Sequence, residues 1–189
     1  MILTVTLNPL LELRLTYDSI EFGKSHRNPK EEFQAGGKGI NVSRQLNCLK
    51  TPNMVFTFLG GNNGKKLRHL LEDEKIGFSS IRTEDETRFG SVVIGGSPVT
   101  VTNFFGRNSV VTENEVNEFL TKLEKMIGNC EIVVFSGSSP CENTGRIFIE
   151  GIKIANNQDK ISVLDTYGSH LSECIDASPT IIHNNKTEI

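Results

Sequence analysis

The sequence has few cysteines and histidines, and neither occurs in a metal-binding pattern. Its four cysteines contain no C-x-x-C pair, and its four histidines contain no H-E-x-x-H spacing. This arrangement excludes the common zinc motifs and a dense disulfide framework. We therefore expect reduced thiols, with Cys48 and Cys130 packed in the interior.

The sequence also lacks a basic excess, a long apolar run and, in its first residues, the features of a signal peptide. Lys and Arg number 20 against 23 Asp and Glu, so the formal net charge is −3. This balance argues against a nucleic-acid-binding surface. No apolar run approaches the roughly 20 residues of a membrane span, and residues 1–5 carry no basic region or small-residue cleavage site. We expect no nucleic acid, no membrane and a cytoplasmic location.

What is present is an alternation of strand-like and helix-like segments. With 189 residues, 37% of them hydrophobic, the chain is long enough for one domain with a core. Several strands are continuous apolar runs, which is typical of a mostly parallel α/β sheet with helices on both faces. The predicted strands of this sheet are 2–7, 54–59, a short one at 81, 131–136, 161–164 and 180–182.

Helices are predicted between these strands from apolar spacing and capping residues. Val42, Leu46 and Leu49 recur at helical spacing, so residues 40–50 should form a helix that buries them. Asn62 or Asn63 is expected to cap a second helix that Gly77 ends. Further helices are predicted over 112–127, where T-E-N-E forms a capping box, and over 144–156 and 169–175.

Two segments lie outside the alternation, and we assign them to a small separate sheet. Residues 11–16 alternate apolar and polar side chains, which is typical of a strand with one polar face. Residues of about 90–105 contain two strand-like runs around Gly95-Gly96-Ser97, a hairpin signal.

The stretch 35–42, A-G-G-K-G-I-N-V, places three glycines and a lysine just before a predicted helix. Glycine lets a backbone approach a ligand closely, and a helix start offers free N–H groups and a positive dipole end. The stretch therefore suits a small, hydroxyl-rich anion. A tight turn that only starts the helix is the alternative interpretation.

Polar residues follow several predicted strands, at 8, 60–62, 136–138, 165–166 and 184–185. Ligands of open α/β sheets bind beyond the carboxyl ends of the strands, so one edge of the sheet is the expected site.

Taken in order, these segments resemble the ribokinase-like sugar kinases of the phosphofructokinase B type, the branch that includes 1-phosphofructokinases and tagatose-6-phosphate kinases. The matching motifs are T-V-T-L-N-P at 4–9, A-G-G-K-G-I-N-V at 35–42, F-L-G-G-N-N-G at 58–64, E-T-R at 86–88, S-G-S-x-P at 136–140, D-T-x-G at 165–168 and N-x-x-E at 185–188. The resemblance covers essentially the whole chain. It implies a ribokinase-like α/β domain over 1–189, with lid strands at about 11–16 and 90–105.

The resemblance implies phosphoryl transfer from ATP, with Mg²⁺, to a hydroxyl of fructose 1-phosphate, fructose 6-phosphate or tagatose 6-phosphate. The lid would close over the sugar and, as in some relatives, form a homodimer surface. Lys38 and Arg88 would hold the phosphate that the substrate already carries, because two cations suit a dianion. The implied substrate-binding residues are Glu12, Gly36, Gly37, Lys38, Asn41, Arg88, Asn103, Ser136 and Ser138. Asn185 and Glu188 would act on the nucleotide and Mg²⁺ side.

The chain departs from the family pattern at three places. Glu12 stands where the family has aspartate, and His183-Asn184 stand where it usually has lysine and proline. No G-x-G-D, the family's general-base and anion-hole motif, occurs in the 189 residues. We therefore expect the C-terminal nucleotide-binding part, with the general-base aspartate, to lie beyond Ile189. The chain would be a fragment of a kinase or a truncated product, inactive alone.

Three other functions share this fold class or this family. A catalytically dead remnant that binds sugar phosphate is the main alternative, and nucleoside or vitamin kinases of the same superfamily are a nearer enzymatic rival. A Rossmann oxidoreductase is set aside, because Asn8-Pro9-Leu10 stands after the first strand in place of G-x-G-x-x-G.

Overall fold

A central parallel sheet organises the chain, in a computed structural model that describes residues 1–21 and 23–185. Within this range six strands lie in the order β10-β9-β8-β1-β4-β5, and every neighbouring pair is parallel. Their bounds are β1 Ile2–Thr6, β4 Asn53–Gly60, β5 Phe78–Thr83, β8 Ile132–Ser136, β9 Ile161–Asp165 and β10 Ile181–Ile182. The predicted α/β class with a mostly parallel sheet is confirmed.

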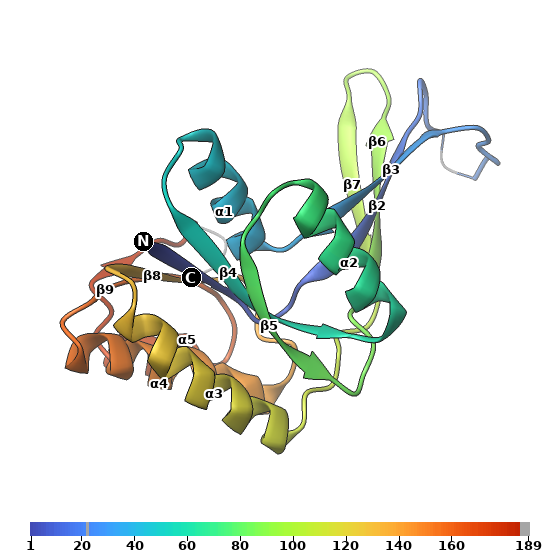
Figure 1. The fold of residues 1–189 in the computed structure, drawn as a ribbon. Coiled ribbons are helices and arrows are strands. Elements are labelled where there is room, and N and C mark those ends of the chain that lie inside the picture. Colours follow the sequence, from blue (N-terminus) through green and yellow to red (C-terminus); the bar gives the residue numbers. More distant parts are fainter. Residues whose placement is uncertain (22, 186–189) are drawn as a thin grey trace.

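Helices cover both faces of this sheet (Figure 1). On one face lie α1 (Lys38–Cys48) and α2 (Gly61–Asp73), and on the other lie α3 (Glu113–Gly128), α4 (Gly145–Asn157) and α5 (Leu171–Asp176). None of the helices in the described residues is long and apolar enough to cross a membrane.

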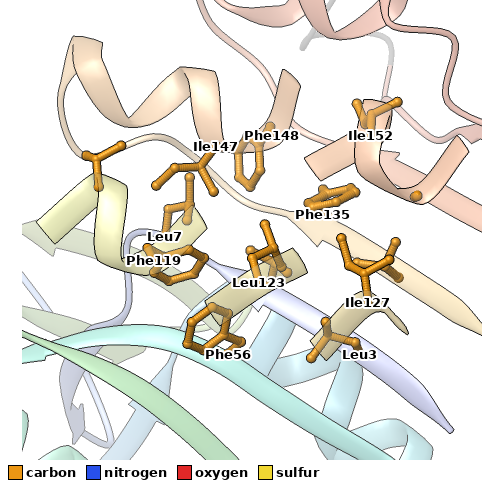
Figure 2. Close-up of a cluster of buried hydrophobic side chains, with 14 of the residues drawn as sticks. Leu3, Leu7, Phe56, Phe119, Leu123, Ile127, Phe135, Ile147, Phe148 and Ile152 are labelled. Atoms are coloured by element: carbon orange, nitrogen blue, oxygen red, sulfur yellow. The ribbon is translucent and has the colours of Figure 1, made fainter. Parts of the chain in front are cut away.

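The larger hydrophobic core lies between the sheet and α3 and α4 (Figure 2). Alternate residues of β1, Leu3 and Val5, point into it and are fully buried. Phe119 of α3 stacks on Phe56 of β4, with ring centroids 3.9 Å apart. Because these aromatic rings bury large apolar areas, this face supplies much of the hydrophobic stabilisation.

A second sheet, in the order β3-β2-β6-β7, projects from one end of the central sheet (Figure 1). It contains β2 (Leu10–Thr16), β6 (Phe89–Gly95) and β7 (Thr100–Phe105), which correspond to the segments assigned to a small sheet. The prediction missed β3 (Lys30–Gly36), which pairs antiparallel with β2. Its first residues, Lys-Glu-Glu, have low strand propensity, so pairing with β2 rather than local preference makes this segment a strand.

The predicted buried face of α1 is only partly correct, because Val42 and Leu46 are half-buried and Leu49 is not buried. The helix buries Gly39, Ile40 and Ser43, whereas Leu49 is 73% exposed. Its contact with β1 is close and partly polar, since Ser43 Oγ lies 2.8 Å from Thr4 Oγ1. Because α1 packs against the sheet through its first turn, its last turn points toward solvent. Cys48 is therefore exposed rather than packed. Cys130 is buried as predicted.

The start of α2 also differs from the prediction. Gly60 is the N-cap and has no side chain to accept a hydrogen bond, and neither Asn62 nor Asn63 occupies the N-cap position. The carboxylate of Glu86 instead accepts the backbone N–H of Asn63. The helix ends at Asp73, four residues before the predicted stop at Gly77.

The capping box of α3 is confirmed and gives a first testable prediction. Thr112 Oγ1 accepts the N–H of Glu115 at 3.3 Å, and Glu115 Oε2 accepts the N–H of Thr112 at 2.7 Å. We expect Thr112→Ala to lower the free energy of unfolding by about 1 kcal/mol, measured by urea denaturation at constant slope. Thr121→Ala, at an exposed mid-helix position, is the control and should change it by less than about 0.5 kcal/mol. Equal losses in the two variants would contradict a capping role.

The order of the strands determines where a ligand fits. From β1 the chain builds outward through β4 and β5 on one side, and later through β8, β9 and β10 on the other. The carboxyl ends of β1 and β8 therefore flank a topological switch point, the place where open α/β sheets bind ligands.

Candidate functional site

The glycine stretch forms the junction between the two sheets at this switch point. Gly36 ends β3, and Gly37 is the N-cap of α1 with φ of +134°, a conformation that favours glycine. A Cβ at Gly39 would lie 2.2 Å from Thr6 Oγ1, so the first turn of α1 rests directly on the end of β1. The free N–H groups of α1 thus begin at the carboxyl edge of the sheet.

A pocket of about 270 Å³ opens in front of this helix start. It brings together most of the residues predicted for substrate binding, from five different parts of the fold. The predicted residues that line it are Glu12, Gly37, Lys38, Asn41, Arg88, Asn103 and Ser138. A wider hollow of about 600 Å³ adjoins it and shares Arg88, Phe105, Ser138 and Tyr167 with it.

One side of the pocket carries a carboxylate and an amide, which form hydrogen bonds but add no positive charge. Glu12 of β2 is mostly buried, and its Oε1 lies 3.6 Å from Nε of Arg14. Gly36 leaves room for this carboxylate, because a Cβ there would lie 3.2 Å from Glu12 Oε2. Asn41 lies one turn into α1, and its Oδ1 accepts a hydrogen bond from Arg44.

Lys38 supplies one cation of the pocket. Its ammonium lies 3.2 Å from Oδ1 of Asp165, at the end of β9, and 5.4 Å from the ring centroid of Tyr167. Asp165 also accepts a hydrogen bond from Ser136 Oγ at 2.9 Å. Ser136 is fully buried, so it meets the site through Asp165 and does not line the pocket itself.

Arg88 supplies the second cation and is the more unusual group. Its Nη2 donates to the backbone oxygen of Asn8 at 3.2 Å and its Nη1 to Asn108 Oδ1 at 3.3 Å, while its Nε is buried without a partner. Within residues 1–21 and 23–185 no carboxylate forms an ion pair with it. Burial accordingly lowers the pKa of Arg88 from its ordinary value, because desolvation disfavours the charged form.

The small sheet contributes the outer wall. Asn103 and Phe105 alternate on β7 and both line the pocket, and the Phe105 ring lies 5.3 Å from the guanidinium carbon of Arg88. β7 is exposed along its whole length. The pocket is therefore open on this side.

The nucleotide-side predictions lie at the end of the described chain. Glu188 falls outside the described residues, so its prediction has no structural counterpart. Asn185 follows β10 and lines neither hollow. His183 Nδ1 lies 3.6 Å from Asp165 Oδ1, and Asn184 Nδ2 donates to the backbone oxygen of Thr166 at 2.6 Å.

Several residues of the site were not assigned a role from the sequence, among them Phe105, Asn108, Asp165 and Tyr167. Phe105 was accessible to prediction, because it lies two positions after Asn103 in a strand and so shares its face. The contacts of Asp165, Tyr167 and Asn108 join residues 20 to 129 positions apart, and no local pattern indicates them.

The parallel sheet, its switch-point pocket and the small sheet beside it define a ribokinase-like α/β domain. The sequence profile described as pfkB family carbohydrate kinase matches residues 8–189. The chain belongs to this family.

Named relatives agree with this assignment. The chain is 27% identical over its whole length to a tagatose-6-phosphate kinase of Staphylococcus epidermidis and 30% identical to a 1-phosphofructokinase of Borreliella burgdorferi. It spans 61% and 60% of the length of these two curated relatives. Among solved structures, a possible 1-phosphofructokinase of Thermotoga maritima superposes with a TM-score of 0.90 at 28% identity, covering 97% of this chain and 60% of that one. The phosphofructokinase-2 of Escherichia coli in complex with fructose-6-phosphate gives 0.87 at 26%, with 99% and 62% covered.

Proposed function

We propose that this chain supplies the sugar-phosphate side of a kinase that phosphorylates a ketohexose phosphate with ATP. The hydroxyl oxygen of the sugar would attack the γ-phosphorus, the bond to ADP would break, and a base would take the hydroxyl proton. The candidate substrates are fructose 1-phosphate, fructose 6-phosphate and tagatose 6-phosphate. Two similar proteins, named a tagatose-6-phosphate kinase and a 1-phosphofructokinase, support this class of substrate.

The observation that carries the proposal is the state of Arg88. A half-buried guanidinium that no described carboxylate pairs with costs folding free energy. Such a charge is retained where a bound ligand supplies the negative partner. Lys38 lines the same pocket, so a phosphate dianion between the two would gain two charge-assisted contacts. We assign these two side chains to the phosphate that the substrate already carries.

The remaining residues would then meet the sugar hydroxyls. Glu12, as a carboxylate, accepts hydrogen bonds from hydroxyl donors, while Asn41 and Ser138 both donate and accept. Gly36 and Gly37 would let the backbone approach the sugar, with Ser136 acting through Asp165. Asn103 would contact the substrate from the small sheet, which we propose closes as a lid and excludes water.

Mg²⁺ and ATP are proposed as the phosphoryl-donor pair. No three His, Cys, Asp or Glu side chains in the described ranges gather to hold a metal ion, so we assign Mg²⁺ to the ATP phosphates. Asn185 and Glu188 are proposed to order water around that ion. When bound, it would neutralise charge on the phosphates.

We also propose that the lid forms a homodimer surface. Val101 and Phe105 share the Asn103 face of β7 and are 58% and 55% exposed. Exposed apolar side chains grouped on one strand face are typical of an association surface.

The proposal is tested by binding and turnover on the 189-residue polypeptide. Isothermal titration should detect fructose 1-phosphate, fructose 6-phosphate or tagatose 6-phosphate, with unphosphorylated fructose at least tenfold weaker. A coupled ADP assay should detect no turnover, because the printed sequence contains no G-x-G-D. Failure of all three sugar phosphates to bind at millimolar concentration would refute the proposed substrate class. Turnover by this polypeptide would refute the assignment of the base outside it.

A further inference from the structure

Two segments that connect the small sheet to the central domain are locked together. Arg107 donates to both carboxylate oxygens of Asp85, at 2.7 Å each, and the N–H of Val110 donates to the same carboxylate at 2.7 Å. Ser109 Oγ donates to the backbone oxygen of Glu86 at 2.7 Å. These contacts hold residues 107–110, which leave the small sheet, against residues 85–86, which enter it.

Asn108 lies at the centre of this lock and lines the wider hollow that adjoins the pocket. Its Oδ1 accepts hydrogen bonds from Asn8 Nδ2 at 3.0 Å and from Arg88 Nη1 at 3.3 Å. Asn8 Nδ2 also donates to Ser138 Oγ at 3.0 Å, and the backbone oxygen of Asn8 accepts from Arg88 Nη2 at 3.2 Å. A single carboxamide oxygen thus joins the strand end of β1 to the guanidinium.

We infer that Asn108 is a positioning residue that holds Arg88 in the orientation required to receive the substrate phosphate. Apart from Asn108, the described structure gives the Arg88 guanidinium one hydrogen-bond acceptor, the backbone oxygen of Asn8. Removal of the Asn108 amide would free Nη1 and let the planar group rotate, since a bidentate contact needs a fixed guanidinium plane. This inference rests on the proposed function of Arg88.

The position of Asn108 makes the inference easy to separate from a role in stability. Asn108 is exposed, and its backbone is held by the lock at Arg107 and Ser109 rather than by its own side chain. Exposed substitutions of this kind usually leave stability almost unchanged. A purely structural asparagine would affect all ligands equally, whereas a residue that orients Arg88 affects only ligands with a phosphate.

The first experiment measures sugar-phosphate binding to the 189-residue polypeptide. Asn108→Ala should raise the Kd of the best-binding sugar phosphate about fivefold to tenfold and leave that of unphosphorylated fructose unchanged. Asn108→Gln keeps an amide acceptor on an exposed, longer side chain and should recover affinity to within about threefold. Asn129→Ala, at the exposed C-cap of α3, is the matched control and should bind like the wild type. An unchanged Kd in Asn108→Ala overturns the inference.

The second experiment needs no ligand. The Arg88 Nε–Hε resonance, identified by its loss in Arg88→Met, should shift in Asn108→Ala and exchange with solvent several-fold faster. The Gln variant should restore it. An unaltered Arg88 signal overturns the inference even if no sugar phosphate binds, which would separately refute the proposed function.

Discussion

Replacing Arg88 with methionine is expected to weaken sugar-phosphate binding about 100-fold while leaving the protein at least as stable. A hydrogen bond to a charged group contributes about 1.5–3 kcal/mol, and each 1.4 kcal/mol is tenfold in Kd. Methionine keeps apolar contact with Phe105 and removes a half-buried cation that no described carboxylate pairs with. Because desolvation of such a charge costs stability, the free energy of unfolding should stay equal or rise by up to about 1 kcal/mol.

Titration calorimetry and urea denaturation of the same variant measure the two effects. Arg82→Met is the matched control, because Arg82 is an exposed arginine on β5 that does not line the substrate pocket. It should change neither quantity appreciably. Equal weakening of fructose and of its phosphates in Arg88→Met would show that Arg88 shapes the pocket rather than binding phosphate.

Replacing Gly60 with alanine is expected to give the largest loss of stability, about 3 kcal/mol or more. Gly60 has φ of −134°, an extended conformation that any residue adopts, so the cause is contact alone. A Cβ there would lie 1.9 Å from the backbone oxygen of Asp85 and 2.2 Å from Thr83 Oγ1. Since a backbone atom cannot turn aside as a side chain does, the segment that carries Arg88 must move away from β4.

The displacement of the segment that carries Arg88 should lower both the free energy of unfolding and the affinity for sugar phosphate. Thr87 holds this segment to β4 through hydrogen bonds with the N–H and the oxygen of Gly60, at 2.9 and 3.0 Å. Gly77→Ala is the control, because its nearest neighbour would be 3.6 Å from the new Cβ, and it should change the free energy of unfolding by less than about 1 kcal/mol. Similar unfolding midpoints for the two alanine variants would contradict the predicted clash.

Most of the fold was predictable because its signals are local. The apolar runs of β1, β4, β8 and β9 and the spacing in α3 each depend on residues a few positions apart. Side chains at such spacings lie on one face of a helix or strand whatever the rest of the chain does. The α/β class and the separate hairpin of β6 and β7 followed from them.

The errors occurred where a distant partner outweighed the local pattern. β3 begins with three charged residues and is a strand because β2 pairs with it. The periodicity of α1 indicated a buried Leu49, but close contact at Gly39 and Ser43 determines which side of the helix meets β1. Small side chains determine how closely a helix can pack against a strand, and hydrophobic periodicity does not indicate where they make contact.

The residue types of the site were determined by the sequence: glycines before a helix, a carboxylate, two cations and polar strand ends on one predicted edge. Their arrangement was decided by the tertiary structure. The neighbouring parallel strands β1 and β8 bring residues 8 and 138 together, and the pairing of β2 with β6 brings residue 88 beside them. The lock between Asp85 and Arg107 brings Asn108 to Arg88. Such contacts depend on how whole elements pack, and a hydrogen bond requires its partners within about 3 Å, a precision that no local pattern in a chain contains.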